Sequence, residues 1–177
     1  MTNLINLITI SRIMLAPIIL AFLIFGNYLI CILLFFFAGL TDYLDGYLAR
    51  KYNAESQLGE ILDPIADKIL IVFTLIGLSV ILNSLLMAVM SSFIISREIG
   101  IAALRDYSSR NNMSNRTKVT FLAKTKTSIQ LFSIGSYLLA LTMNFNLMIV
   151  VSDIILVIAT LITLFTGYQY TANVFKE

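Results

Sequence analysis

Long apolar runs separated by short polar links constrain this chain more than any other feature of its sequence. A helix needs about 20 apolar residues to cross the hydrocarbon core of a bilayer, and runs of about that length recur along the chain. We therefore predict an all-α, polytopic membrane protein in which the stretch TNLINLITISR forms a short N-terminal interfacial segment. The six transmembrane helices are expected at residues 10–27, 28–48, 61–82, 84–107, 118–142 and 147–170.

Composition favours a single membrane domain that covers residues 1–177. Hydrophobic residues make up 59% of the chain and charged residues 12%, whereas soluble domains carry about 45–50% and about 25%. Six crossings use about 120 residues, which leaves only short connections. Because five further apolar runs follow the first, we interpret the first as a retained span and not as a signal peptide.

The distribution of charge predicts the orientation in the membrane. The links at residues 50–60 and 106–118 are polar and charged, whereas those at 26–27, 83–84 and 144–146 are uncharged. All twelve lysine and arginine residues then fall on or near one side. Cytoplasmic segments carry an excess of such residues. We expect both termini to be cytoplasmic.

Two residue types are scarce, and this narrows the possible chemistry. The chain has no histidine, which excludes histidine bases, histidine metal ligands and Ser-His triads. Its one cysteine, Cys31, lies in an apolar run and is interpreted as a packing residue. Any metal must therefore be held by oxygen ligands, which favours magnesium, manganese or calcium.

Four aspartates form two pairs at the predicted cytoplasmic edge. Asp42 and Asp45 are three residues apart, and Asp63 and Asp67 are four apart, so each pair occupies one helix face. The two spans are joined by a short link, and their faces can meet. Four converging carboxylates repel one another, and two divalent ions can bridge them.

Less specific explanations exist for parts of this pattern. A single D-x-x-D at a helix end is usually solvated surface, and Asp63 ahead of Pro64 could mark the start of a helix. The occurrence of two such faces on adjacent spans at one depth favours a metal site.

The same residues resemble the signature D-x2-D-G-x2-A-R-x8-G-x3-D-x3-D of the CDP-alcohol phosphotransferase family. Eight positions match without a departure. This resemblance implies a six-helix membrane enzyme, usually a homodimer, in which an acceptor hydroxyl displaces CMP from a CDP-linked donor. The matching positions are Asp42, Asp45, Gly46, Ala49, Arg50, Gly59, Asp63 and Asp67.

The resemblance also implies a role for each signature residue. Asp67 is expected to be the catalytic base that takes the proton of the acceptor and to contact metal as well. The expected cofactor is Mg²⁺ or Mn²⁺, with two ions bound. The expected metal ligands are Asp42, Asp45, Asp63 and Asp67, and the expected CDP-binding residues are Asp42, Gly46, Ala49, Arg50 and Gly59.

Three stretches outside the signature are similar to the bacterial phosphatidylglycerophosphate synthases of this family. They are NLINLITISR, REIGIAALRDY and AKTKTSIQ. This similarity implies CDP-diacylglycerol as the donor and sn-glycerol 3-phosphate as the acceptor. It further implies a multi-pass protein of the bacterial inner membrane with its active site on the cytoplasmic side.

A phosphorylated acceptor fits the remaining basic residues. Arg97 lies well inside the fourth span, where a guanidinium requires an anionic partner. Arg105 follows about 80° round the helix, and Lys124 and Lys126 begin the fifth span from the same side. These four are the expected acceptor-phosphate-binding residues, although the two lysines point about 160° apart. We interpret Glu98 as a structural ion-pair partner.

Two groups of alternatives remain at this point. Within the family, the acceptor could be inositol phosphate, serine or a second phosphatidylglycerol. In a different class, the aspartates could be ion sites of a cation transporter or channel. The clustering of the acids at one edge disfavours transport, and Asp153 is the only acidic residue in the predicted outer half.

Overall fold

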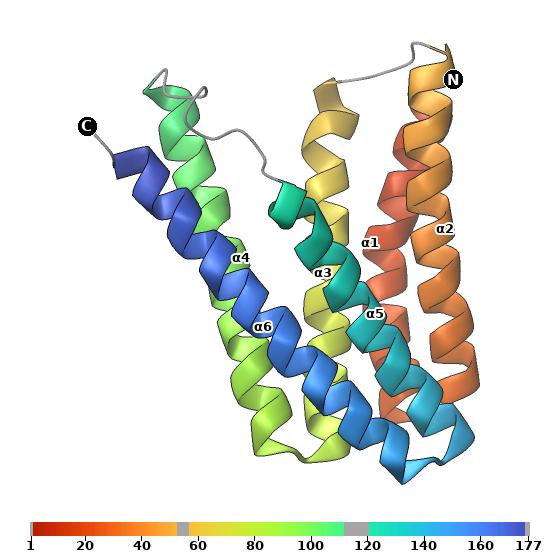
Figure 1. The fold of residues 1–177 in the computed structure, drawn as a ribbon. Helices are drawn as coiled ribbons and strands as arrows, with labels where there is room; N and C mark the ends of the chain where they lie inside the picture. Colours follow the sequence, from red (N-terminus) through yellow and green to blue (C-terminus); the bar gives the residue numbers. More distant parts are fainter. Residues whose placement is uncertain (1, 53–56, 112–120, 176–177) are drawn as a thin grey trace.

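The computed structural model describes residues 2–52, 57–111 and 121–175. Within them, the side chains of residues 2–6, 43, 45, 47–50, 52, 57, 58, 60 and 121–125 are not described. Six helices account for these ranges and confirm the all-α prediction (Figure 1). The helices are α1 (Thr2–Ile24), α2 (Tyr28–Tyr52), α3 (Gln57–Leu82), α4 (Leu85–Arg110), α5 (Phe121–Met143) and α6 (Asn146–Phe175).

Helices α1, α3, α4 and α6 are long and apolar enough to cross a bilayer by length and composition. Helices α2 and α5 are less uniformly apolar. The apolar part of α2 ends at Asp42, and α5 buries polar residues, among them Gln130, Ser133 and Ser136. Both nevertheless pack within the same bundle, because α2 contacts α1 and α5, and α5 contacts α6. The chain is thus a polytopic helical membrane protein.

Two helices begin earlier than the hydropathy pattern predicts. Helix α1 begins at Thr2, so TNLINLITISR and the first apolar run form one continuous helix. Helix α3 begins at Gln57 and contains Pro64 in its interior. The alternative in which Asp63 and Pro64 start a helix is therefore wrong. Pro64 has no amide hydrogen to donate to the carbonyl of residue 60, a loss that membrane helices tolerate.

The three short uncharged links form tight turns at one end of the bundle (Figure 1). Gly26, Asn83 and Asn144 adopt positive φ angles of 75°, 45° and 55°, the left-handed conformation that commonly ends a helix. After α1, the amide of Gly26 donates to the carbonyl of Leu23, and that of Asn27 to the carbonyl of Phe22, both at 3.0 Å. Each turn reverses the chain, so the start of α1 and the end of α6 both lie at the opposite end of the bundle, on different sides of it (Figure 1).

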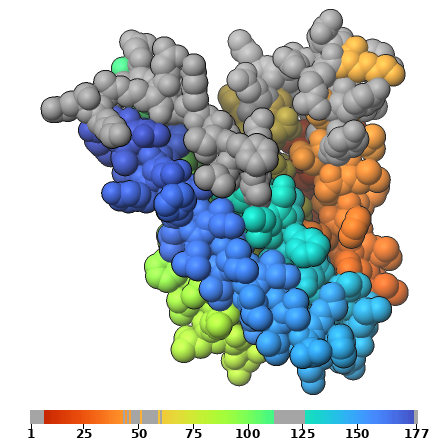
Figure 2. Space-filling view, in the orientation of Figure 1, coloured from red at the N-terminus to blue at the C-terminus, as the bar shows by residue number. Residues whose placement is uncertain are grey.

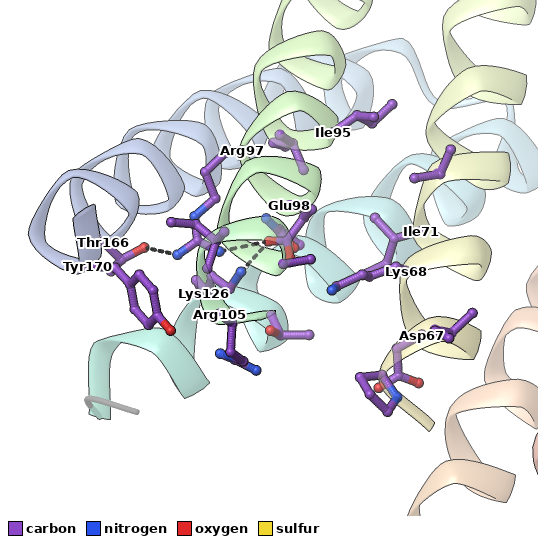
Figure 3. A pocket seen from close by; sticks show the side chains of 18 of the residues that line it. Asp67, Lys68, Ile71, Ile95, Arg97, Glu98, Arg105, Lys126, Thr166 and Tyr170 are labelled. Carbon is purple, nitrogen blue, oxygen red and sulfur yellow. Dashed lines mark hydrogen bonds and ion pairs between the residues drawn. The ribbon is translucent and has the colours of Figure 1, made fainter. Parts of the chain in front are cut away.

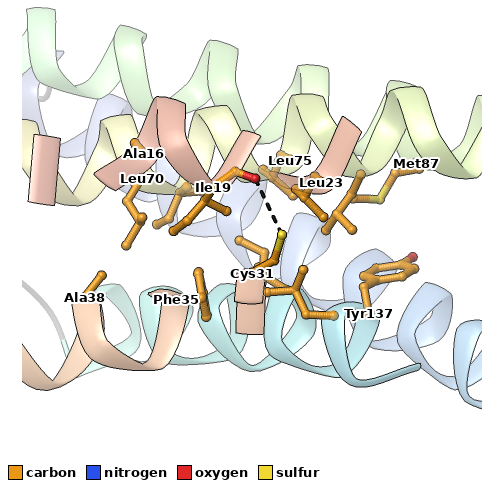
Figure 4. Packing of buried hydrophobic residues seen from close by; sticks show 14 of the residues in the cluster. Ala16, Ile19, Leu23, Cys31, Phe35, Ala38, Leu70, Leu75, Met87 and Tyr137 are labelled. Atoms are coloured by element: carbon orange, nitrogen blue, oxygen red, sulfur yellow. Dashed lines mark hydrogen bonds between the residues drawn. The ribbon is translucent and has the colours of Figure 1, made fainter. Parts of the chain in front are cut away.

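The core is built largely from α1, α2 and α3 and extends to Met87 of α4 and Tyr137 of α5 (Figure 4). Ile19 and Leu23 of α1 are fully buried there, and Cys31 packs beside them, which confirms its predicted packing role. Gly77 allows α1 and α3 to approach closely. A β-carbon at Gly77 would lie 2.8 Å from a methyl carbon of Leu23.

Large apolar side chains also cover the outside of the bundle. Phe36 on α2, Leu85 on α4 and Phe132 on α5 are more than two-thirds exposed. In Figure 2, α5 and α6 form a continuous face between α2 and α4. Such extensive apolar exposure fits a lipid environment and not water.

Candidate active site

Three carboxylates from two helices converge on one arginine of a third helix. The Nη1 atom of Arg12 on α1 lies 2.8 Å from Oδ1 of Asp67 and also contacts Oδ1 of Asp42. Its Nη2 atom lies 3.3 Å from Oδ1 of Asp63. Asp42 belongs to α2, and Asp63 and Asp67 belong to α3. The structure thus brings Asp42 of one predicted acidic face together with Asp63 and Asp67 of the other.

The arginine lies behind the carboxylates. The side chain of Arg12 is fully buried, whereas those of Asp42, Asp63 and Asp67 are 48%, 42% and 41% exposed. Thr9, one turn earlier on α1 and also fully buried, donates a 2.8 Å hydrogen bond to Oδ1 of Asp63. The acids are therefore held from the α1 side and remain accessible on the other.

This arrangement offers suitable ligands for a hard divalent cation. Carboxylate oxygens are the ligands that Mg²⁺ and Mn²⁺ prefer, and three of them meet within reach of one guanidinium. Among the described side chains, no three acids form a completed metal-binding group. Each acid instead directs one oxygen to Arg12. The residues present fit the cation in chemistry and accessibility.

Several predicted site residues have side chains outside the described set. They are Asp45, Ala49, Arg50 and Lys124, whose backbone atoms belong to α2 or α5. The two glycines of the signature are described. Gly46 is half-buried on α2, and Gly59 is buried on α3, two turns before Asp67.

A large cavity connects one of the three carboxylates, Asp67, to the predicted acceptor site. Its volume is about 740 Å³, and it lies between α3, α4, α5 and α6. Asp67 lines one side, and Arg97, Glu98 and Lys126 line another (Figure 3). Arg105 also contributes to the wall. Three of the four predicted phosphate-binding residues therefore share one cavity with Asp67.

Glu98 holds two cations of this cavity in place. Its Oε1 atom accepts a 3.1 Å ion pair from Nη1 of Arg97 and a contact from Nζ of Lys126. The side chains of Arg97 and Lys126 are 8% and 9% exposed, so unpaired charges there would be costly. The predicted ion-pair role of Glu98 is confirmed, and its partners lie on α4 and α5.

Helix α6 completes the wall around Arg97. Thr166 accepts a 3.1 Å hydrogen bond from Nη2 of Arg97. Gly167 lies beneath the same side chain, and a β-carbon there would stand 3.0 Å from Cγ and 3.1 Å from Nε of Arg97. The aromatic ring of Tyr170 lies 5.9 Å from the guanidinium carbon of Arg105, a cation–π distance.

Two buried polar atoms at the cavity have no hydrogen-bond partner among the described residues. They are Nε of Arg97 and the hydroxyl of Tyr170, both on cavity-lining side chains. Buried donors without partners are uncommon in proteins and call for an explanation. A polar ligand in this cavity would supply one.

Three residues that the structure places at the site, Arg12, Thr9 and Thr166, were not predicted from the sequence. Arg12 entered the prediction only as one of the twelve basic residues that indicate the orientation in the membrane. A signal existed for Thr9 and Arg12, because a spacing of three places both on one helix face. No comparable pattern marks Thr166.

Comparisons with known proteins agree with the signature. The family model for CDP-alcohol phosphatidyltransferase matches residues 2–170. A CDP-diacylglycerol–glycerol-3-phosphate 3-phosphatidyltransferase of Blochmanniella floridana is 37% identical over 171 residues, which cover 94% of this chain and 88% of the relative. Proteins with the same description from Haemophilus influenzae (strain ATCC 51907 / DSM 11121 / KW20 / Rd) and Rickettsia typhi (strain ATCC VR-144 / Wilmington) are 34% and 35% identical. These two alignments cover 92% and 96% of the chain, and 88% and 96% of the relatives.

Proposed function

Because the chain belongs to the CDP-alcohol phosphatidyltransferase family, we propose that it transfers the phosphatidyl group of CDP-diacylglycerol to sn-glycerol 3-phosphate. The products are phosphatidylglycerol phosphate and CMP. The named relatives support this donor and this acceptor. The enzyme is a membrane-embedded phosphatidyltransferase of phospholipid biosynthesis.

One structural observation carries the proposal: a single cavity has a signature carboxylate and a cluster of cations in its walls. Asp67 can meet the reacting hydroxyl of an acceptor, while Arg97 and Lys126 meet an anionic group of the same molecule. Glycerol 3-phosphate has a hydroxyl and a phosphate separated by a short carbon chain. These two groups correspond in chemistry to the carboxylate and the cations in the cavity walls.

The acceptor phosphate binds among Arg97, Arg105 and Lys126, together with Lys124. Glu98 and Thr166 hold Arg97 in a defined position, so little side-chain freedom is lost when phosphate binds. Arginine offers paired donors to phosphate oxygens. Arg105 is exposed and stands over Tyr170, which suits it to contact the ligand from the cavity mouth.

The donor end is built from the signature. Asp42, Asp45, Asp63 and Asp67 would hold the divalent ions, two Mg²⁺ or Mn²⁺, and Gly46, Ala49, Arg50 and Gly59 would line the CDP site with Asp42. Bound ions of this kind neutralise the oxygens of a diphosphate. Gly59 is buried, and a glycine allows a bulky donor to approach the backbone closely.

The residues of the chain suffice to describe the proton and bond changes. The acceptor hydroxyl oxygen forms a bond to the phosphatidyl phosphorus, and the bond from that phosphorus to the bridging diphosphate oxygen breaks. CMP leaves with the bonding electron pair, and the hydroxyl proton passes to Asp67. General bases of this kind contribute about 10²–10⁴-fold to rate.

The location of the site follows from the distribution of charge. Asp42, Asp63 and Asp67 belong to the halves of α2 and α3 nearest the link between these helices, at the end of the bundle where α1 begins and α6 ends (Figure 1). The sequence places the basic residues on the same side. Such a bias is typical of the cytoplasmic side. We propose that the protein works as one domain at the cytoplasmic face of a bacterial inner membrane. The family resemblance further implies that it works there as a homodimer.

A product assay tests this proposal. Membranes containing the protein are supplied with CDP-diacylglycerol and labelled glycerol 3-phosphate, with and without Mg²⁺, and lipid-soluble label is measured. Parallel reactions receive inositol phosphate, serine or phosphatidylglycerol as the acceptor. Preferred incorporation of one of these would reassign the acceptor. No product with any acceptor, together with cation flux in vesicles, would favour a transporter.

A further inference from the structure

One fully buried arginine lies behind the carboxylate cluster and belongs to no part of the signature. Arg12 sits on α1, a helix that contributes none of the eight signature residues. Its guanidinium reaches Asp42 on α2 and both Asp63 and Asp67 on α3. A single side chain therefore joins the two segments that carry the signature acids.

The stability of each charge in this cluster depends on the charges beside it. A fully buried guanidinium is unfavourable unless carboxylates pair with it, and three carboxylates that share one partner repel each other. Arg12 offsets only one of the three formal negative charges. The cluster keeps its attraction for further cations while it is held together.

The geometry favours positioning over simple charge neutralisation. A guanidinium is planar and presents several donors in fixed directions, and both terminal nitrogens of Arg12 are used. Thr9 adds a third donor from the same face of α1. Because Arg12 is buried and the acids are 41–48% exposed, an ion can approach them from the exposed side.

We propose that Arg12 is a positioning residue that holds the carboxylates of α2 and α3 together before divalent ions bind, and then shares them with the ions. The inference rests on the metal-binding role of these acids in the proposed function. Removal of Arg12 should destabilise the metal-free protein more than the metal-bound protein. By linkage, ion binding should become tighter while the ions are less well placed for catalysis.

The first experiment uses purified full-length Arg12→Gln and no substrate. Thermal unfolding is recorded in EDTA and in saturating Mg²⁺, and Mn²⁺ binding is measured from the electron paramagnetic resonance signal of free Mn²⁺. The gap between the two midpoints should exceed that of the wild type by at least about 4 °C. The Mn²⁺ affinity should be at least about threefold tighter, because a competing cation has been removed.

The matched control is Tyr137→Phe. Tyr137 is fully buried on α5 and donates a hydrogen bond to Asp153 on α6, near the turn that joins these helices. This variant removes a buried polar contact that is unrelated to the carboxylates. It should lower both midpoints by the same amount, so the gap between them should stay that of the wild type.

Two further variants separate charge repulsion from loss of packing. In Arg12→Gln/Asp42→Asn, removal of one repelling carboxylate should partly restore the midpoint in EDTA. Arg12→Lys keeps the charge without the planar fork, so its midpoint should fall more in EDTA than in Mg²⁺. If Arg12→Gln yields no folded protein, the comparison of the two midpoints is made with Arg12→Lys instead.

Equal falls of both midpoints in the arginine variants would overturn the inference, as would an EDTA midpoint that Asp42→Asn fails to raise in the Arg12→Gln background. If Mg²⁺ does not change the unfolding midpoint of the wild-type protein and Mn²⁺ does not bind to it, the inference is overturned together with the metal part of the proposed function. If instead the unfolding midpoints and the Mn²⁺ affinity change as predicted but the product assay yields no lipid product, only the assigned reaction is overturned.

Discussion

The Nη1 atom of Arg12 lies 2.8 Å from Oδ1 of Asp67, across a separation of 55 residues in the chain. The contact ties the proposed catalytic base on α3 to the N-terminal helix α1. Arg12 is fully buried, and Asp67 lines the cavity between α3, α4, α5 and α6. The orientation of the base therefore depends on a helix that carries none of the signature.

Asp67→Asn should strongly reduce turnover and leave the protein folded. The amide keeps the size of the side chain but cannot take the proton of the acceptor, so we expect kcat to fall by about 10²–10⁴-fold. CMP release is measured with purified enzyme, and folding is checked by gel filtration and thermal unfolding. Full activity in a folded variant would rule out the assigned role.

Arg97→Met should weaken recognition of the acceptor phosphate. Loss of charged hydrogen bonds costs about 1.5–3 kcal/mol, so the KM for glycerol 3-phosphate should rise by about 10- to 100-fold. The KM for CDP-diacylglycerol should not change. Arg110→Gln is the control, because Arg110 is 77% exposed and pairs with Asp106. Equal effects on both substrates would argue against a phosphate site at Arg97.

Gly167→Ala should displace the side chain of Arg97. The new methyl group would stand 3.0 Å from Cγ of Arg97, so the guanidinium must shift relative to Thr166 and Glu98. We expect an increase of about three- to tenfold in the KM for glycerol 3-phosphate, equivalent to about 0.7–1.4 kcal/mol. Gly135→Ala is the matched control, because a β-carbon at Gly135 meets no atom within 4 Å. Identical kinetics of the two variants would contradict this positioning.

Tyr137→Phe should lower stability without lowering activity. The tyrosine hydroxyl donates to Asp153 between α5 and α6, near the turn at Asn144 and Phe145 that joins them. Loss of such a hydrogen bond costs about 0.5–1.5 kcal/mol, or about 1–6 °C in the unfolding midpoint. A change in kcat would show that this outer contact is coupled to the active site.

Much of the architecture follows from local sequence patterns. The apolar runs identify the helices, and the uncharged links at Gly26, Asn83 and Asn144 coincide with turns in which each residue adopts a positive φ angle. The helix ends were harder to predict. The polar residues at the start of α1 and around Pro64 resemble helix boundaries. Both helices nevertheless continue through these residues, and α1 and α3 pack against each other.

The site was predictable where its residues lie close in the chain. Asp42, Asp63 and Asp67 share helix faces on neighbouring spans, and Arg97 and Arg105 share one on α4. Arg12 and Thr166 depend on contacts across 55 and 69 residues. No local periodicity reports such contacts, because they arise only when the bundle packs.

The most direct test of the account is CMP release by the purified protein before and after divalent ions are stripped with EDTA. Reactions contain CDP-diacylglycerol and glycerol 3-phosphate, and Mg²⁺ or Mn²⁺ is then added back. We predict that release stops after chelation and returns with the added ion, because the carboxylates around Arg12 require it to act on the diphosphate. Undiminished CMP release from the stripped protein would contradict the central claim.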